Sequence, residues 1–418
     1  MKRWQWALRL LTRRMWFRAA LFCLFALALS LAGALAGHTI SYEFAARVGA
    51  QSVDNILNVL ASSMLAVTTF SLTAMVSAYA GATTNITPRA VQLLVDDTTA
   101  QNALATFLGS FLFAVAGIIA LSTGLYGETG RVILLAGTIL VIVVIVLTFL
   151  RWIQHITQFG RVGDTIGRVE RAASHAVEMM ALRPRFGTNE QTSAPHEAIL
   201  IVHPKIGRIT HIDMGQLGDV ARDTGAVITL TALPGAFAEP GRMIAWSLEP
   251  LDEEQRARIV DAFTVSSNRA FDHDPRFGLV VLSEIASRAL SPAVNDPGTA
   301  IAVIEAGTRI LAAMLRHDPK AEFAIPPGVN LPPFNFSDLI EDMFRPISRD
   351  GAGIVEVGIR LQKALVSLAS VSAEAHENCR NEAADALERA CEGLSSQADR
   401  EHLLKVYEDA WGGTLING

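Results

Sequence analysis

Hydrophobic positions form long unbroken runs before residue 151 and short, periodic ones after it. Each long run has close to the roughly 20 residues that a helix needs to cross a bilayer. The four runs are Ala19–Gly37, Asn58–Ala80, Ala103–Thr123 and Val132–Leu150. We therefore predict an α-helical membrane domain of four transmembrane helices within residues 1–150, followed by soluble α+β structure.

Basic residues predict which side of the membrane the chain ends occupy. Six precede the first acidic residue, Glu43: Lys2, Arg3, Arg9, Arg13, Arg14 and Arg18. Four more follow the last run: Arg151, Arg161, Arg168 and Arg171. Cytoplasmic flanks of membrane helices are enriched in Lys and Arg, so both the N-terminus and the large C-terminal region are expected in the cytoplasm, at a bacterial inner membrane. Ala34-Leu35-Ala36 resembles a signal-peptidase site, and cleavage there is an alternative that leaves this orientation unchanged.

The later part divides by pattern into three segments. Residues 151–195 are expected to form a helical stalk, continuous with the fourth span, and a polar linker. Residues 196–250 contain short strands broken by Gly and Pro and resemble a barrel-sandwich module of the biotinyl-lipoyl type. Its only lysine, Lys205, is wrongly placed for a carrier lysine, so no cofactor is expected. Residues 251–418 show helical periodicity, and residues 90–102 suggest a short amphipathic helix at the membrane surface.

The second run is unusual because it lacks charge yet is rich in hydroxyls. Ser62, Thr69 and Thr73 fall near one helical face and Ser77 continues it, which makes these four the pore-lining candidates. The alternative is helix packing, in which Ser and Thr bond to their own helix and let neighbours approach. The pattern fits either interpretation.

Two stretches carry a resemblance to a known family. The first is Thr87-Pro88-Arg89 with Phe107-Leu108-Gly109-Ser110-Phe111. The second runs from Phe277-Gly278 through Glu284-Ile285-Ala286-Ser287-Arg288-Ala289-Leu290-Ser291-Pro292-Ala293-Val294-Asn295-Asp296-Pro297-Gly298-Thr299-Ala300. Together they resemble the predicted bacterial membrane proteins grouped as domain of unknown function 2254, although Thr87 stands where Ser is more usual. The resemblance covers nearly the whole chain and implies N-terminal membrane helices with a large soluble part.

The turn between two predicted helices is the candidate ligand site. Its ligand-binding candidates are Arg269, Arg288, Ser291, Asn295 and Asp296. The start of the following helix could bind a small anion with help from the two arginines. The alternative is structural: Asn295 and Asp296 fix the turn, and Glu284 pairs with Arg288 on the helix surface.

Other chemistry finds little support in the sequence. The chain has no P-loop, zinc-protease or nucleophile-elbow motif, and its three cysteines have no metal-binding spacing. Asp272-His273-Asp274 fits an exposed turn better than a metal site, and His203 and His211 fit ordinary strand positions. No charged residue lies in the middle of an apolar run, which argues against a proton-coupled transporter. Basic residues are not interleaved with aromatic ones, so no nucleic-acid partner is expected.

These observations favour an oligomeric channel-like or transport-related membrane protein with a cytoplasmic sensing and assembly region. Its expected partners are the lipid bilayer, further copies of the chain and a small anion or ion. A non-transporting, membrane-anchored ligand-binding or scaffold protein is the alternative. No metal or catalytic set can be assembled, so an enzyme is not expected.

Overall fold

The computed structural model describes residues 50–85, 87–95, 97–123, 128–157, 161–180, 194–318 and 325–412, with three isolated positions before residue 50. The chain forms two compact units. The membrane unit contains the long apolar helices, and the large unit contains Val162–Gly418 together with Asn85–Ala90.

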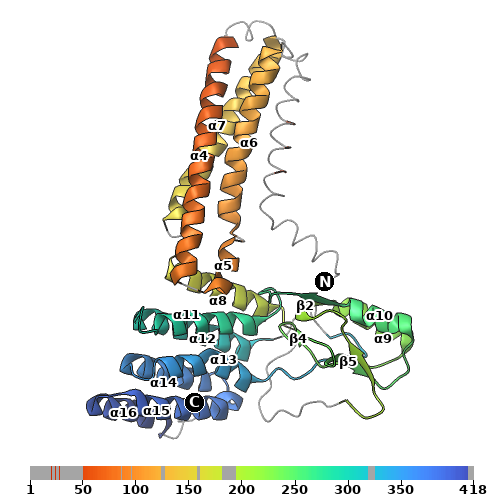
Figure 1. Cartoon of the computed structure of the whole chain (residues 1–418), viewed down its shortest axis with the longest axis vertical. Helices are drawn as coiled ribbons and strands as arrows, with labels where there is room; N and C mark the ends of the chain where they lie inside the picture. The colour runs from red at the N-terminus through yellow and green to blue at the C-terminus, as the bar shows by residue number, and fades with distance from the viewer. Residues whose placement is uncertain are drawn as a thin grey trace. The chain divides into compact units, whose positions relative to one another are not determined.

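Three long helices make up the described part of the membrane unit (Figure 1): α4 (Ala50–Asn85), α6 (Thr98–Ser122) and α7 (Glu128–Ile156). Each contains a stretch long and apolar enough to cross a membrane. They correspond to the second, third and fourth predicted spans. The predicted first span, Ala19–Gly37, lies outside the described residues apart from isolated positions.

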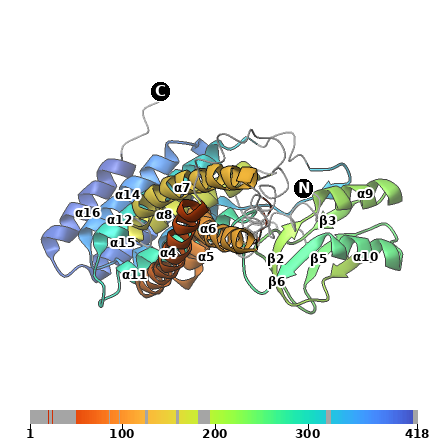
Figure 2. The same cartoon turned by 90° about the horizontal axis from the view of Figure 1, so that it is seen from above.

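Gly117 of α6 shows how the three helices meet. A Cβ atom at this position would lie 3.1 Å from Cδ1 of Leu57 on α4 and 3.5 Å from Cδ1 of Leu134 on α7. Small residues of this kind let helices approach closely in lipid. Seen from above, the ends of α4, α6 and α7 lie side by side (Figure 2). The shared core also includes Met64, Phe107, Phe113 and Trp152.

The connection between α4 and α6 is shorter than the amphipathic segment predicted over residues 90–102. A helix α5 covers only Pro88–Val95, and α6 then begins at Thr98. Asp97 caps α6, because its side chain accepts a hydrogen bond from the N–H of Ala100 at 2.9 Å. Residues 98–102 therefore belong to the apolar helix, which starts five residues before the predicted third span.

The predicted continuous stalk is interrupted. Helix α7 ends at Ile156 and α8 covers Val162–Glu178. Five residues of α8 with helical spacing are buried: Ile166, Val169, Ala173, Ala176 and Val177. A Cβ atom added at Gly278 would lie 2.4 Å from Cβ of Ala173, so α8 and α11 are in close contact. The amphipathic pattern after residue 161 thus serves packing within the large unit.

Six further helices form a bundle with α8. They are α11 (Pro275–Ala289), α12 (Pro297–Arg316), α13 (Phe336–Asp350), α14 (Val355–Ala369), α15 (His376–Gly393) and α16 (Gln397–Trp411). Asp274 and Asp296 cap α11 and α12, and each is followed by a proline at the first helical position. By length and composition α12 could also cross a membrane. However, its Arg309 pairs with Glu170 of α8, and apolar side chains such as Val303, Ile304, Ile310 and Leu311 are buried in the bundle.

The β-rich region is not a barrel, which corrects the barrel-sandwich prediction. One sheet has the order β1-β5-β3-β7 and the other the order β4-β2-β6. The strands are β1 (Ile199–Val202), β2 (Gly207–Ile212), β3 (Ile228–Leu230), β4 (Phe237–Ala238), β5 (Met243–Ser247), β6 (Phe263–Ser266) and β7 (Val329–Asn330). β6 and β7 come from the region predicted to be helical.

Two helices pack against the strands of these sheets. Helices α9 (Met214–Thr224) and α10 (Glu253–Asp261) lie beside the sheets (Figure 2). Leu217 and Val220 of α9 and Ile259 of α10 are fully buried in the same core as the strands. Helices thus supply part of this core, and the module extends well beyond residue 250, to β6 and β7.

Candidate functional site

The predicted pore-lining residues lie on the face of α4 that points away from the core of the membrane unit. Positions 57, 60, 64, 71 and 75 of α4 are buried, whereas Ser62, Thr69, Thr73 and Ser77 are exposed. With 3.6 residues per turn, Ser62, Thr69 and Thr73 fall on the side opposite the buried positions. We call these four residues the hydroxyl face.

Hydroxyls on this face are bonded to their own helix. Ser62 donates to the carbonyl of Asn58 at 3.0 Å, Thr69 to that of Leu65 at 2.9 Å, and Thr73 to that of Thr69 at 3.0 Å. Such bonds satisfy the hydroxyl proton and leave oxygen lone pairs directed outward. The hydroxyl face is therefore not used in packing between the described helices of the membrane unit.

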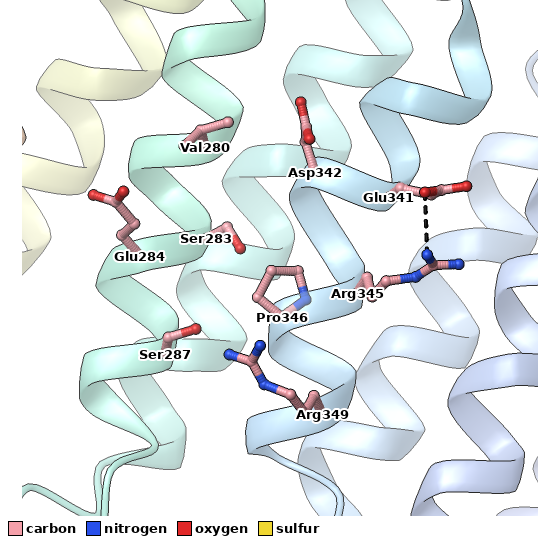
Figure 3. Close-up of a pocket in the computed structure, with 9 residues that line it drawn as sticks. All are labelled: Val280, Ser283, Glu284, Ser287, Glu341, Asp342, Arg345, Pro346 and Arg349. Atoms are coloured by element: carbon pink, nitrogen blue, oxygen red, sulfur yellow. Dashed lines mark ion pairs between the residues drawn. The ribbon is translucent and has the colours of Figure 1, made fainter.

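A second candidate site is a pocket of about 560 Å³ in the large unit (Figure 3). Its volume lies within the range of small-molecule sites. Helices α11 and α13 form its walls. The lining residues are Val280, Ser283, Glu284, Ser287, Glu341, Asp342, Arg345, Pro346 and Arg349.

Each of the three acidic side chains that line the pocket forms an ion pair with an arginine. Glu284 is paired with Arg89, and Asp342 with Arg276. Glu341 Oε2 lies 3.2 Å from Nη1 of the third partner, Arg345. The carboxylates are thus neutralised by partners that contact them directly.

Arg349 of the pocket keeps one guanidinium edge outside its hydrogen bonds to Asp350. Arg349 contacts Asp350 through Nε at 2.7 Å and Nη2 at 3.0 Å, which leaves the Nη1 edge outside these two bonds. These hydrogen bonds raise the pKa of Arg349 and, together with a hydrogen bond from the Ser287 hydroxyl, lower the pKa of Asp350. Arg349 therefore stays charged at any physiological pH. Figure 3 shows its guanidinium directed toward Ser287.

The middle of the pocket is polar and incompletely bonded. Ser283 is only 2% exposed, and its Oγ has no hydrogen-bond partner. Figure 3 shows this hydroxyl directed between the two helices. Pro346 lies inside α13 and has no N–H, so the carbonyl four residues earlier, at Asp342, loses its helical donor. A buried hydroxyl without a partner is costly, which makes Ser283 suited to bond a ligand atom.

The ligand-binding residues predicted from the turn are split between the two ends of α11. Arg269 lies before the helix, while Ser291 and Asp296 lie after it. At 1.5 Å per residue, the 15-residue helix separates them by about 22 Å. Arg269 is held by Asp274, with an Nε to Oδ2 distance of 2.8 Å. The structure therefore does not bring Arg269 to the turn.

At the turn itself the polar residues shape the backbone. Asn295 has a φ of 50°, a left-handed conformation that Asn tolerates well. Asp296 accepts hydrogen bonds from the N–H and Oγ1 of Thr299, which lower its pKa. Ser291 Oγ donates to the carbonyl of Arg288 in the last turn of α11. These contacts match the structural interpretation of the turn, and a ligand-binding role for its residues stays a prediction.

The other sequence candidates have local partners. His203 Nδ1 accepts a hydrogen bond from the N–H of Lys205 at 3.0 Å. His211 packs against His273, with their ring centroids 5.0 Å apart. Asp274 caps α11. Within the described ranges, no group of three or more His, Cys, Asp or Glu side chains is arranged to hold a metal ion.

Sequence reasoning missed the pocket. One signal was available on α11, where Val280, Ser283, Glu284 and Ser287 recur at helical spacing and place two serines and a glutamate on one helix face. The partner surface on α13 carries Arg345 and Arg349 one turn apart. Nothing in the sequence indicates that these two faces meet.

A chain with three long apolar helices and a larger unit of packed helices and small sheets has the architecture of a membrane protein. The chain belongs to the family described as predicted membrane protein (DUF2254), which matches residues 12–367. The family resemblance carried by the two motifs is thereby confirmed.

Similar proteins come from mycobacteria. The uncharacterized proteins Mb1321c of Mycobacterium bovis and Rv1290c of Mycobacterium tuberculosis are each 22% identical to this chain over 237 residues, or 53% of its length. The match spans 45% of each relative's own length. No solved structure matches the chain.

Proposed function

We propose that this protein is an oligomeric, channel-like or transport-related protein of the bacterial inner membrane. In this proposal α4 helices from several copies meet through the hydroxyl face and surround a polar path. The N-terminus and the large unit lie in the cytoplasm, where the large unit serves sensing and assembly.

One observation carries the proposal: the hydroxyl face points away from the core of its own unit. Ser62, Thr69 and Thr73 are exposed, whereas Ser71, on the opposite side, is fully buried. In contact with lipid, a hydroxyl gains nothing over a methyl group. Against a second helix or a water-filled path, small polar side chains allow close approach and provide oxygen ligands for an ion.

Cysteine cross-linking tests the association. In a variant whose three native cysteines are replaced by alanine, Thr69→Cys or Thr73→Cys is expected to give a disulfide-linked dimer in native membranes. Leu72→Cys is the matched control, because Leu72 is 48% exposed on the same helix but lies off the hydroxyl face. Equal cross-linking at Leu72, or none at the other two positions, would contradict the arrangement.

Flux measurements test the path. Proteoliposomes that contain the full chain are expected to pass small ions, and the near-isosteric pair Thr69→Val with Thr73→Val should reduce that flux at least several-fold. An absence of flux under all voltages and ligands would eliminate the channel interpretation. The cross-linking result would still stand as a test of assembly.

The alternative is a membrane-anchored ligand-binding or scaffold protein without transport. The pocket between α11 and α13 favours it, because a ligand site in the large unit needs no path through α4. On this alternative, removal of the hydroxyls from Thr69 and Thr73 leaves all ligand binding unchanged and proteoliposomes show no flux.

A further inference from the structure

We propose that the pocket between α11 and α13 binds a small molecule through an oxyanion, either a carboxylate or a phosphate group. The bound group is held by Ser283 and Arg349. This inference concerns the large unit alone and does not depend on whether α4 lines a path.

The donors left over in the pocket define the ligand. Ser283 presents a buried hydroxyl without a partner. One helical turn later, Ser287 lies on the same wall and bonds Asp350, the partner of Arg349. Arg349 on the opposite wall keeps one guanidinium edge outside its two bonds to Asp350. Hydroxyl and guanidinium donors that converge from two helices match an oxygen-rich anion.

A cationic ligand fits less well, because the carboxylates are already engaged. Glu284, Glu341 and Asp342 each contact an arginine, and Asp342 also shares Arg276 with Asp338. A cation would have to break one of these ion pairs. An oxyanion leaves them in place and accepts hydrogen bonds from the Ser283 hydroxyl and the Nη1 edge of Arg349.

The size of the site and its surroundings point to a metabolite larger than an inorganic ion. A volume of about 560 Å³ exceeds what one phosphate fills. Val280 and Pro346 provide an apolar surface beside the donors. The expected ligand therefore combines one oxyanion with a short carbon skeleton, and citrate and inorganic phosphate serve as probes for the two anion chemistries.

Isothermal titration calorimetry on the purified full-length protein tests this inference, with sodium chloride adjusted to keep ionic strength constant. At least one of citrate and phosphate is expected to bind with one site per chain. Arg349→Gln should weaken that binding by roughly 10- to 100-fold, the range for a hydrogen bond to a charged group. Arg222→Gln is the control, because Arg222 is a 75% exposed arginine on α9 and should bind like wild type.

Ser283→Ala separates ligand binding from folding. Removal of a buried hydroxyl without a partner should leave the unfolding temperature unchanged or raise it. The same variant should weaken anion binding several-fold. Failure of both probes to bind would overturn the proposal, as would wild-type affinity in Arg349→Gln. Both results are independent of ion flux, so they are distinguishable from failure of the channel proposal.

Discussion

Arg89 and Glu284 form an ion pair across 195 residues of sequence, and each lies in one of the two stretches that carry the family motifs. Arg89 follows the last residue of α4 by four positions, and Glu284 lines the pocket. Thr87-Pro88-Arg89 of the first stretch thus meets the second stretch within the large unit.

The Arg89–Glu284 pair is expected to contribute little to global stability. Arg89 is 57% exposed and Glu284 29% exposed, and ion pairs with such exposure contribute below about 1 kcal/mol. A double-mutant cycle with Arg89→Gln and Glu284→Gln, followed by urea unfolding, measures the coupling free energy. A coupling above about 2 kcal/mol would show that the pair has a structural role greater than its exposure implies.

Asp274 should contribute far more to the free energy of unfolding than the Arg89–Glu284 pair does. It is 4% exposed, caps α11 through the N–H of Phe277, and binds Arg269 through two hydrogen bonds. Asp274→Ala leaves a guanidinium without its counter-charge in a half-buried site and removes a helix cap, so a loss of about 3 to 5 kcal/mol is expected.

Asp219→Ala provides the comparison for Asp274→Ala. Asp219 pairs with Arg222 on α9 but is 58% exposed. Its loss should lower the unfolding free energy by less than about 0.5 kcal/mol in the same chemical denaturation experiment. Similar losses for the two variants would contradict the importance assigned to the buried pair.

Glu382 on α15 makes stability depend on pH near neutrality. The side chain is 6% exposed, and burial raises its pKa to about 7, with Asp385 and Glu341 adding to the rise and Arg345 and Arg389 opposing it. The unfolded carboxyl ionises near its ordinary value. Between that value and pH 7 the folded protein therefore holds the extra proton, and stability falls as pH rises, by up to about 3 kcal/mol.

Glu382→Gln should remove this pH dependence. The variant is expected to match wild type at pH 5 and to be more stable at pH 8, as measured by the unfolding free energy at each pH. Glu388→Gln, an exposed position on the same helix, should leave the wild-type profile unchanged. Parallel pH profiles for wild type and Glu382→Gln would show that Glu382 does not titrate in this window.

A larger residue in place of Gly117 should destabilise the membrane unit. Valine at this position places methyl groups against Leu57 and Leu134, whose side chains lie only 3.1 and 3.5 Å from the point that a Cβ atom would occupy. Overpacking of this kind costs about 1 to 3 kcal/mol. Gly81→Val on α4 is the control, because nothing lies within 4 Å of its Cβ position. Thermal unfolding in detergent should show a lower midpoint for Gly117→Val alone.

Sequence patterns predict the apolar helices well because one physical requirement dominates them. A membrane helix must bury about 20 consecutive residues in hydrocarbon, so its position is visible in hydropathy. The ends are less well predicted, because the caps depend on single polar side chains. Asp97 starts α6 earlier than the apolar run indicates, and α4 starts at Ala50, eight residues before the predicted second span.

The β-rich region and the pocket depend on contacts between distant residues. β7 joins a sheet whose other strands precede it by about 80 residues or more, and two-residue strands carry almost no periodic signal. Ser283 and Arg349 share a pocket because α11 packs against α13, and packing partners among several amphipathic helices are not determined by the pattern of any one helix. Local features, such as the helix cap formed by Asp296, can be predicted from the sequence more directly than these distant contacts.

Helix α4 is longer than the hydrocarbon core of a bilayer is thick. At 1.5 Å per residue its 36 residues extend about 54 Å, and the apolar stretch Val53–Gly81 alone extends about 43 Å, against a hydrocarbon thickness of about 30 Å. A helix with such an excess must tilt, thicken the surrounding lipid or project into the headgroup region. Acyl-chain length would then change the tilt of α4, and with it the angle at which the hydroxyl face is presented.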